Sequence, residues 1–288
     1  MEDTRSVSIQ CWGTRGSIPT PGPTTARYGG NTSCVEVAAG DERIILDAGT
    51  GIRLLGERLR EEQSPNDVTL FLSHFHWDHI QGFPFFAPGC DPESSIRILA
   101  PSPERTDAES IMRAQMDPAH FPVPYDELSA EINYHTLSEE GWQEAETRVT
   151  ALRVRHASPT VGYRVEAFGR SLVFVPDNEL VGGEYSTPDG WMDRMVTFAS
   201  DADILIHDAM FTAEEYQSRE GWGHSTFSQA FELAERAGVK ALQFFHHSPH
   251  RSDAELDGIT RHFREKAEAR GLGMDVQAAE EGARLVLG

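Results

Sequence analysis

The chain has 288 residues, of which 39% are hydrophobic and 25% are charged, a composition typical of a globular protein that can bury a sizeable core. No apolar run approaches the roughly 20 residues that span a bilayer, and residues 1–5 contain no apolar signal core, so we expect no membrane partner and no export. The balance of 25 basic against 46 acidic residues gives a net charge of −21, which repels polyanions and argues against long nucleic acid as a partner.

The cysteines Cys11, Cys34 and Cys90 are odd in number and show no paired spacing. This pattern argues against a disulfide framework and against a zinc site made of cysteines. A reducing cytoplasm is the location that fits it best.

The first half of the chain predicts strands, one early helix and one long loop. Residues 13–33 are rich in glycine, proline and other turn residues, and loops of this length are often functional. A capping box from Thr106 to Glu109 predicts the start of a second helix, and residues 117–125 look irregular. We expect the region 101–127 to be a lid or an interface element, which leaves a homodimer open. The predicted strands cover residues 7–12, 34–38, 43–47, 68–72 and 96–99, and the early helix covers 52–61.

The second half predicts more strands and two well-capped helices. Thr226 and Ser252 each begin a capping box, and Phe227 and Phe231 fall on one face of the first of these helices. We find no repeat and no linker, so we expect a single domain over residues 1–288. The predicted strands cover residues 131–135, 148–156, 161–168, 171–176, 203–207 and 240–246.

The stretch from His74 to His79 concentrates four side chains that can bind a transition metal: His74, His76, Asp78 and His79. It directly follows the apolar run 68–72. Side chains two apart in extended backbone share a face, so His74 and His76 point to one side, while Asp78 and His79 start the next turn. One short loop could therefore supply ligands to two neighbouring ions.

Six apolar runs end in a residue that can bind a metal or move a proton. In an α/β sheet the functional site lies at the carboxyl ends of the strands, so we expect these residues to meet in one cleft. Taken singly, each would more often be a cap or a satisfied polar group. The residues are Asp47, His74, His156, Asp177, His207 with Asp208, and His246.

The order of these residues resembles the metallo-β-lactamase superfamily, whose His-x-His-x-Asp-His motif is matched at every defined position of 74–79. The resemblance covers nearly the whole chain and implies an α/β fold, a four-layer αββα sandwich of two mixed sheets flanked by helices. It also implies two divalent metal ions per chain. One ion would be held by His74, His76 and His156, the other by Asp78, His79 and His246, and Asp177 would bridge them.

The chemistry of two close ions supports this division of ligands. Imidazole suits borderline ions such as zinc, our first expectation, with manganese as the second. Two such ions need an anionic bridge against their repulsion, which Asp177 can supply, and a metal-bridging hydroxide would be the nucleophile. We interpret Asp47 as a residue that orients the metal ligands without binding a metal itself.

Two further stretches resemble the phosphodiesterase branch, which includes tRNA 3′-end endonucleases and cyclic-phosphate diesterases: residues 223–226 around His224, and residues 207–209 around Asp208. The resemblance implies that His224 is catalytic and is held by Asp208, and Asp78 is assigned to the catalytic set as well as to the ligands. A histidine paired with a carboxylate can protonate a departing alkoxide. The alternative is a structural His224 at a helix start, with Asp208 as a cap.

The spacing of His156 and Asp177 limits the size of the expected substrate. Only 21 positions separate them, which is room for a hairpin and not for the long arm of the tRNA-processing enzymes. Residues 30–34 also resemble a bacterial group of small phosphodiesterase-like hydrolases. We therefore predict a phosphodiesterase acting on a small or cyclic nucleotide-like phosphodiester. The alternatives are a lactonase or thioester hydrolase and, third, a non-catalytic signalling module.

Two sets of residues near the motifs are candidates for substrate contact. Arginines can grip a phosphate, although each is as readily an ordinary salt-bridging residue, and aromatic rings can stack on a nucleobase, although most pack in a core. The arginines are Arg15, Arg27, Arg164 and Arg251, and the aromatic residues are Trp77, Phe83, Phe85 and Phe86.

Overall fold

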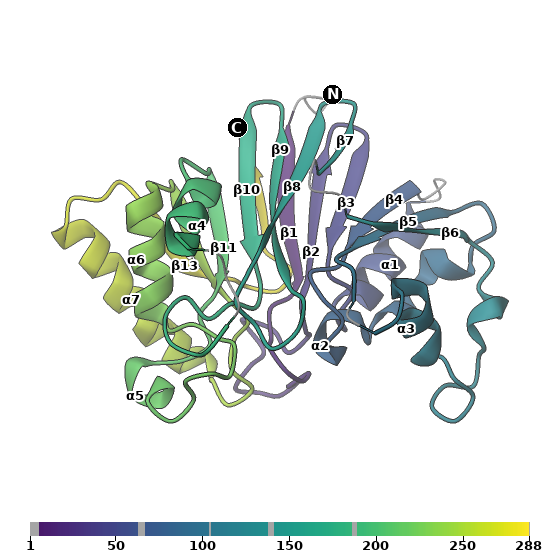
Figure 1. Cartoon of the computed structure of the whole chain (residues 1–288), viewed down its shortest axis with the longest axis horizontal. Helices are drawn as coiled ribbons and strands as arrows, with labels where there is room; N and C mark the ends of the chain where they lie inside the picture. Colours follow the sequence, from purple (N-terminus) through teal and green to yellow (C-terminus); the bar gives the residue numbers. More distant parts are fainter. Residues whose placement is uncertain (1–5, 63–66, 104, 138–140, 186–188, 288) are drawn as a thin grey trace.

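Two mixed sheets packed face to face, with helices on both outer faces, make up the fold of this chain (Figure 1). The computed structural model describes residues 6–62, 67–103, 105–137, 141–185 and 189–287. The four-layer αββα sandwich expected from the sequence is confirmed. Residues 1–5, on which the expectation about export rests, lie outside the described residues.

The first sheet has seven strands in the order β14-β1-β2-β3-β4-β5-β6. Its strands are β1 (Val7–Gly13), β2 (Cys34–Ala39), β3 (Glu42–Leu46), β4 (Asp67–Phe71), β5 (Ser95–Ala100), β6 (Glu131–Thr136) and β14 (Arg284–Leu287). Neighbours are antiparallel from β14 to β3 and parallel from β3 to β6.

The second sheet also has seven strands, in the order β13-β12-β11-β10-β9-β8-β7. Its strands are β7 (Trp142–Glu144), β8 (Thr147–Arg153), β9 (Val161–Ala167), β10 (Arg170–Val175), β11 (Ile204–Asp208), β12 (Ala241–Phe245) and β13 (Asp275–Ala278). The run from β10 to β13 is parallel and the run from β7 to β10 is antiparallel. Each sheet therefore has a parallel half whose strands end on the same side.

Helices cover the outer face of each sheet because both faces of these strands are apolar. Helices α1 (Ile52–Glu61) and α3 (Ala108–Ala114) flank the first sheet, together with the short α2 (Trp77–Ile80) and the 3₁₀ turns η1 (Phe83–Phe85), η2 (Ala87–Cys90) and η3 (Tyr125–Glu127). Helices α4 (Trp191–Ala199), α6 (Phe227–Ala237) and α7 (Asp253–Ala269) flank the second, and the short α5 (Ala213–Tyr216) precedes α6.

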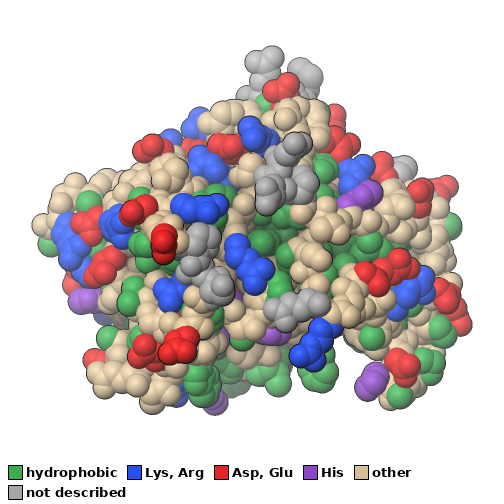
Figure 2. Space-filling view, viewed as in Figure 1, with side chains coloured by type: hydrophobic (Ala, Val, Ile, Leu, Met, Phe, Trp, Pro, Cys, Tyr) green, Lys and Arg blue, Asp and Glu red, His purple; other side chains and the backbone are tan. Residues whose placement is uncertain are grey.

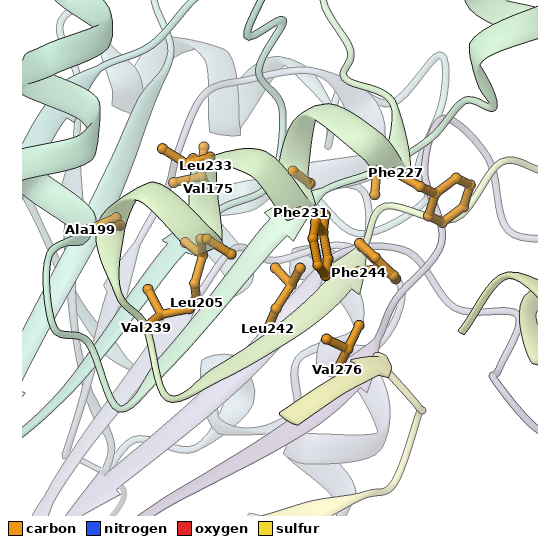
Figure 3. Packing of buried hydrophobic residues seen from close by; sticks show 14 of the residues in the cluster. Val175, Ala199, Leu205, Phe227, Phe231, Leu233, Val239, Leu242, Phe244 and Val276 are labelled. Atoms are coloured by element: carbon orange, nitrogen blue, oxygen red, sulfur yellow. The ribbon is translucent and has the colours of Figure 1, made fainter. Parts of the chain in front are cut away.

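Helix α6 shows how the sequence fixes these layers. The Thr226 hydroxyl accepts a hydrogen bond from the amide of Gln229, and the Gln229 side chain accepts one from the amide of Thr226, so the predicted capping box is present. Phe227 and Phe231 face β12, where the Phe227 ring lies edge-on to Phe244 at 5.1 Å between centroids (Figure 3). This packing holds the loop that precedes α6, which carries His224, against the second sheet.

Several predicted boundaries differ from the structure. The strand expected over 148–156 ends at Arg153, so His156 lies on the following loop. Helix α3 is capped by Asp107, whose carboxylate accepts from the amide of Ser110, and not by Thr106. Helix α4 and the short strands β7, β13 and β14 were not predicted. Strands of three or four residues at a sheet edge are too short to show a hydrophobic period.

Among the described residues, no helix combines the length and the apolar composition that crossing a bilayer requires.

Candidate metal centre

The polar side chains that end the strands come together at one edge of the sandwich. Asp47 follows β3, His74 follows β4, Asp177 follows β10 and His246 follows β12, so the two parallel halves meet there. A hollow of about 480 Å³ opens at this edge, lined by Ser17, Phe75, His76, Trp77, Asp78, Asp177, His224 and His246. His207 faces away from it, with its ring between the Asp208 carbonyl and the Asn178 side chain.

Three histidines surround one oxygen of Asp177. The Nε2 atom of His74 lies 3.7 Å from Asp177 Oδ2, and Nε2 of His156 lies 3.4 Å from the same oxygen. The Nδ1 atom of His76 is 3.1 Å from His156 Nε2. These four side chains form one group whose ligand atoms all lie within 4.8 Å of one another.

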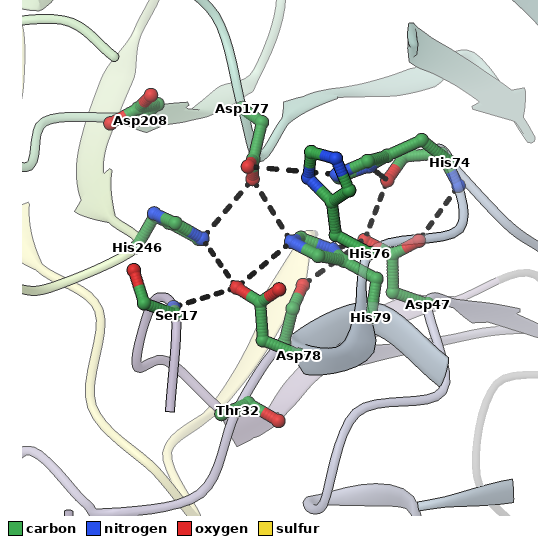
Figure 4. Close-up of polar contacts among 12 residues, drawn as sticks. Ser17, Thr32, Asp47, His74, His76, Asp78, His79, Asp177, Asp208 and His246 are labelled. Carbon is green, nitrogen blue, oxygen red and sulfur yellow. Dashed lines mark hydrogen bonds and ion pairs between the residues drawn. The ribbon is translucent and has the colours of Figure 1, made fainter. Parts of the chain in front are cut away.

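A second group surrounds the other oxygen of Asp177. The Nε2 atoms of His79 and His246 lie 3.1 and 3.2 Å from Asp177 Oδ1 (Figure 4). They are also 3.3 and 3.1 Å from Asp78 Oδ2. Asp177 thus turns one oxygen to each histidine group, so a single carboxylate contacts both groups.

The donor set fits divalent metal ions. His74 Nε2, His79 Nε2 and Asp177 Oδ1 are buried and have no hydrogen-bond partner in the described chain. Asp78 and Asp177 pair with histidines alone, and no Lys or Arg among the described residues forms an ion pair with either. Buried carboxylates without a cation are strongly destabilising, so this cluster is suited to bound positive charge.

For His74, His79 and His156, the ring nitrogen that faces away from Asp177 is held by the protein. His79 Nδ1 donates to Asp47 Oδ2 at 2.7 Å, and His156 Nδ1 donates to the Gly223 carbonyl at 2.9 Å. His74 Nδ1 lies 3.0 Å from the Ser73 hydroxyl, which itself donates to Asp47. Such partners fix the tautomer and leave the Nε2 lone pair free for a metal.

Burial also sets the protonation of the cluster. It lowers the pKa of His74 and His76 and brings that of His156 to about 4, so these rings are neutral at neutral pH, the form that binds metal. Burial opposes the ionised form of both aspartates, but the nearby His79 and His246 hold the pKa of Asp78 and of Asp177 well below its usual range.

The residues behind the ligands come from the first sheet and the long loop. Asp47 is fully buried, and its backbone adopts a φ of 63°, an uncommon conformation for a residue other than glycine that often marks functional sites. His246 shares this feature, with a φ of 57°. From the glycine-rich loop, the amide of Ser17 donates to Asp78 Oδ2 at 2.7 Å.

His224 lies on the wall of the hollow beside both groups. Its ring stacks on that of His246 at 4.8 Å between centroids, and its Nδ1 donates to Asp208 Oδ2 at 2.9 Å. Asp208 is buried and also accepts the amides of Asn178 and Met210. Burial disfavours the charged ring, but the charge and hydrogen bond of Asp208 outweigh it and raise the pKa of His224 to about 9.

Glu179 was not singled out from the sequence, although it lies two residues beyond Asp177. It is fully buried and accepts four hydrogen bonds. The donors are the amides of Gly221 and Gly223, at 2.8 and 2.9 Å, and the hydroxyls of Tyr185 and Tyr216, at 2.6 and 2.5 Å. Glu179 therefore anchors the loop that carries both His224 and the carbonyl bound by His156.

The four candidate arginines lie elsewhere. None of them is among the described residues that line the hollow. Arg15 is buried and donates to the carbonyls of Gly29 and Arg251. The other three pair with acidic side chains: Arg27 with Asp257, Arg164 with Glu166, and Arg251 with Glu215.

The candidate aromatic residues divide into two pairs. Phe83 and Phe86 are each 2% exposed and belong to the core between the first sheet and its helices. Trp77 and Phe85 are 78% and 56% exposed.

Comparison with known proteins places this geometry in a family. Residues 42–247 match the family described as "Beta-lactamase superfamily domain". Ribonuclease Z of Halobacterium salinarum is 28% identical over 288 residues, which cover 84% of this chain and 87% of that protein.

Two solved structures share the fold. The metallo-β-lactamase fold protein YhfI from Bacillus subtilis superimposes with a TM-score of 0.69 at 18% identity, covering 98% of this chain and 100% of that one. A diphosphatase from the PhnP family gives 0.67 at 19% identity, covering 97% of each chain. The chain therefore belongs to the beta-lactamase superfamily, and it is a metal-dependent hydrolase on the phosphodiesterase branch of the metallo-β-lactamase fold.

Proposed function

We propose that this protein is a dinuclear phosphodiesterase that hydrolyses a small or cyclic nucleotide-like phosphodiester. Two ions, zinc before manganese, would be held by the two histidine groups that share Asp177. The relatives named ribonuclease Z and the structural neighbour named a diphosphatase act on bonds to phosphorus, which supports the reaction class.

The observation that carries the proposal is the pairing of His224 with Asp208 on the wall of the hollow. Asp208 binds Nδ1 of the ring, so Nε2 is the nitrogen left to serve a substrate. A phosphodiester needs help for its departing alkoxide more than an ester with a stable leaving group does. The pair has no evident task in the hydrolysis of a lactone or a thioester.

The residues of the chain divide the reaction between them. When bound, the ions would act as Lewis acids and lower the pKa of water. Asp177 would set their separation with its two oxygens, while His224 would donate the proton from Nε2 to the departing alkoxide oxygen. Asp208 would keep the ring oriented and stabilise its positive charge. Asp78, which faces the hollow, would both bind metal and serve the reacting centre.

The net charge of the chain and the hairpin of β9 and β10 both support a small substrate. That hairpin, residues 161–175, occupies most of the chain between His156 and Asp177, so no long arm for a folded RNA projects there. The net charge of −21 also disfavours a polyanion.

The proposal also covers the domain organisation and the cellular location of the protein. We treat residues 1–288 as one catalytic domain, with 101–127 as an insertion beside the site. A cytoplasmic location is supported by Cys11, Cys34 and Cys90, all of which are free thiols.

Hydrolysis assays on metal-loaded protein test the proposal. Bis(p-nitrophenyl) phosphate should be cleaved faster than a lactone or a thioester reporter, and His224→Ala should slow the cleavage of a phosphodiester with an alkoxide leaving group more than that of this p-nitrophenyl ester. His262→Ala is the matched control, because His262 is exposed on α7. A parent enzyme that prefers the lactone or thioester, with His224→Ala fully active, would contradict the proposal.

A further inference from the structure

A second hollow lies beside the metal centre. It has a volume of about 390 Å³, within the range of small-molecule pockets. One wall comes from α2 and η1, with Trp77, Gln81 and Phe85, and the other from α3 and the turn after it, with Gln115 and Phe121. These two walls are far apart in the sequence and belong to different elements.

Two aromatic side chains of this hollow, Trp77 and Phe85, are largely exposed. Trp77 is 78% exposed and Phe85 56%, while Phe83, two residues from Phe85, is buried at 2%. Phe85 meets Phe121 edge to face at 5.3 Å between centroids. Figure 2 shows hydrophobic side chains along the lower edge of the molecule, where Figure 1 places α2. Exposed aromatic side chains that line a hollow are found at binding sites more often than on the rest of a protein surface.

The hollow is uncharged in a strongly acidic protein. Its described lining contains no Asp, Glu, Lys or Arg, although the chain has 46 acidic residues. The polar groups are the carboxamides of Gln81 and Gln115 and the ring of His120. A carboxamide offers both donors and an acceptor, which matches the edge of a nucleobase or a similar heterocycle.

The hollow adjoins the metal centre, because Phe75 and Trp77 line both. A ligand with its phosphorus beside Asp177 could therefore place a planar group next to Trp77. Resting on the proposed phosphodiesterase function, we propose that this second hollow is the subsite that binds an uncharged planar heterocycle of the substrate, a nucleobase in the case of a nucleotide. The heterocycle stacks on Trp77 and Phe85 and forms hydrogen bonds with the Gln115 carboxamide.

This assignment gives the insertion over 101–127 a specific task. Ile111, Ala114, Gln115 and Phe121 of that insertion all line the hollow. The insertion then selects the substrate, and exchanging it would change the preferred organic group without changing the metal ligands.

A matched pair of esters separates this proposal from the reaction itself. Thymidine 5′-(p-nitrophenyl phosphate) and methyl p-nitrophenyl phosphate share a leaving group and differ only in the base-bearing part. The metal-loaded enzyme should prefer the thymidine ester in kcat/KM. Phe85→Ala and Gln115→Ala should each remove about 5- to 100-fold of that preference, mainly through KM, and leave the methyl ester unchanged. Val286→Ala, a similarly exposed apolar side chain on β14, is the control.

Binding measurements make the test independent of turnover. In calorimetric titrations thymidine 5′-monophosphate should bind more tightly than 2-deoxyribose 5-phosphate, and Phe85→Ala should remove the difference. If neither ester is cleaved but this difference is found, the phosphodiesterase proposal fails and the subsite stands.

Equal rates for the two esters and equal affinities for the two phosphates would overturn the subsite while leaving the reaction intact. The same holds if Phe85→Ala converts a dimer to a monomer without changing either preference, because the aromatic surface would then be an interface between two copies of the chain.

Discussion

Asp47→Asn should weaken metal binding by about 10- to 100-fold, the usual effect of removing a partner from behind a metal ligand. The Asp47 carboxylate accepts four hydrogen bonds. The donors are the amide and hydroxyl of Ser73 at 2.7 and 3.0 Å, the hydroxyl of Ser33 at 3.1 Å, and His79 Nδ1 at 2.7 Å. A carboxamide of the same size has only one oxygen to offer.

The magnitude follows from how those bonds are divided. Oδ1 accepts from the Ser73 amide alone, whereas Oδ2 accepts the other three. If the amide nitrogen takes the place of Oδ1, the buried Ser73 amide loses its acceptor. If it takes the place of Oδ2, His79 loses the partner that fixes its tautomer. Either arrangement leaves a buried donor unpaired, which should also lower the free energy of unfolding by about 1–3 kcal/mol.

Zinc affinity should be measured by competition with a chromophoric chelator, alongside thermal unfolding of the metal-free protein. Asp41→Asn is the matched control, because Asp41 is exposed in the turn between β2 and β3. Unchanged zinc affinity in Asp47→Asn, with the fold intact by circular dichroism, would refute the reasoning that Asp47 orients His79.

Three further substitutions separate the roles within the site. Asp177→Ala should abolish activity and reduce occupancy of both ions, measured by elemental analysis, because both histidine groups share this carboxylate; full occupancy of both would show that it is no bridge. His224→Ala should lower the rate by about 10²- to 10⁴-fold with metal content unchanged, and by less for a p-nitrophenolate than for an alkoxide leaving group; equal losses would exclude proton donation. Glu179→Gln should reduce activity or metal affinity by about 10- to 100-fold, because a carboxamide cannot accept all four donors, and wild-type values for both would exclude it as an anchor.

The sequence allowed the prediction of the sandwich and of the cluster because both depend on short-range patterns. The apolar runs before Asp47, His74 and Asp177 are strands whose carboxyl ends lie at one edge. His74 and His76 fall in one group, as their spacing of two in extended backbone predicts, while Asp78 and His79 lie on α2. Asp47 lies against His79 as interpreted, while the assignment of the seven ligands stays a prediction.

What could not be predicted depends on contacts between distant segments. Glu179 gains its donors from residues 185, 216, 221 and 223, and no local pattern links them. Four aromatic residues in and after the motif look alike in the sequence, yet Phe83 and Phe86 enter the core and Trp77 and Phe85 do not. For the three phenylalanines that division depends on the 3₁₀ turns η1 and η2, which have no hydrophobic period of their own.

The most direct test of the account is the metal content of the purified protein after removal and reloading of zinc, measured by plasma mass spectrometry against protein concentration from amino-acid analysis. The two histidine groups on either side of Asp177 predict two ions per chain, with anomalous scattering placing one near His74 and His156 and the other near His79 and His246. A ratio of one or less, with a single anomalous peak, would contradict the bridged pair on which the proposed chemistry rests.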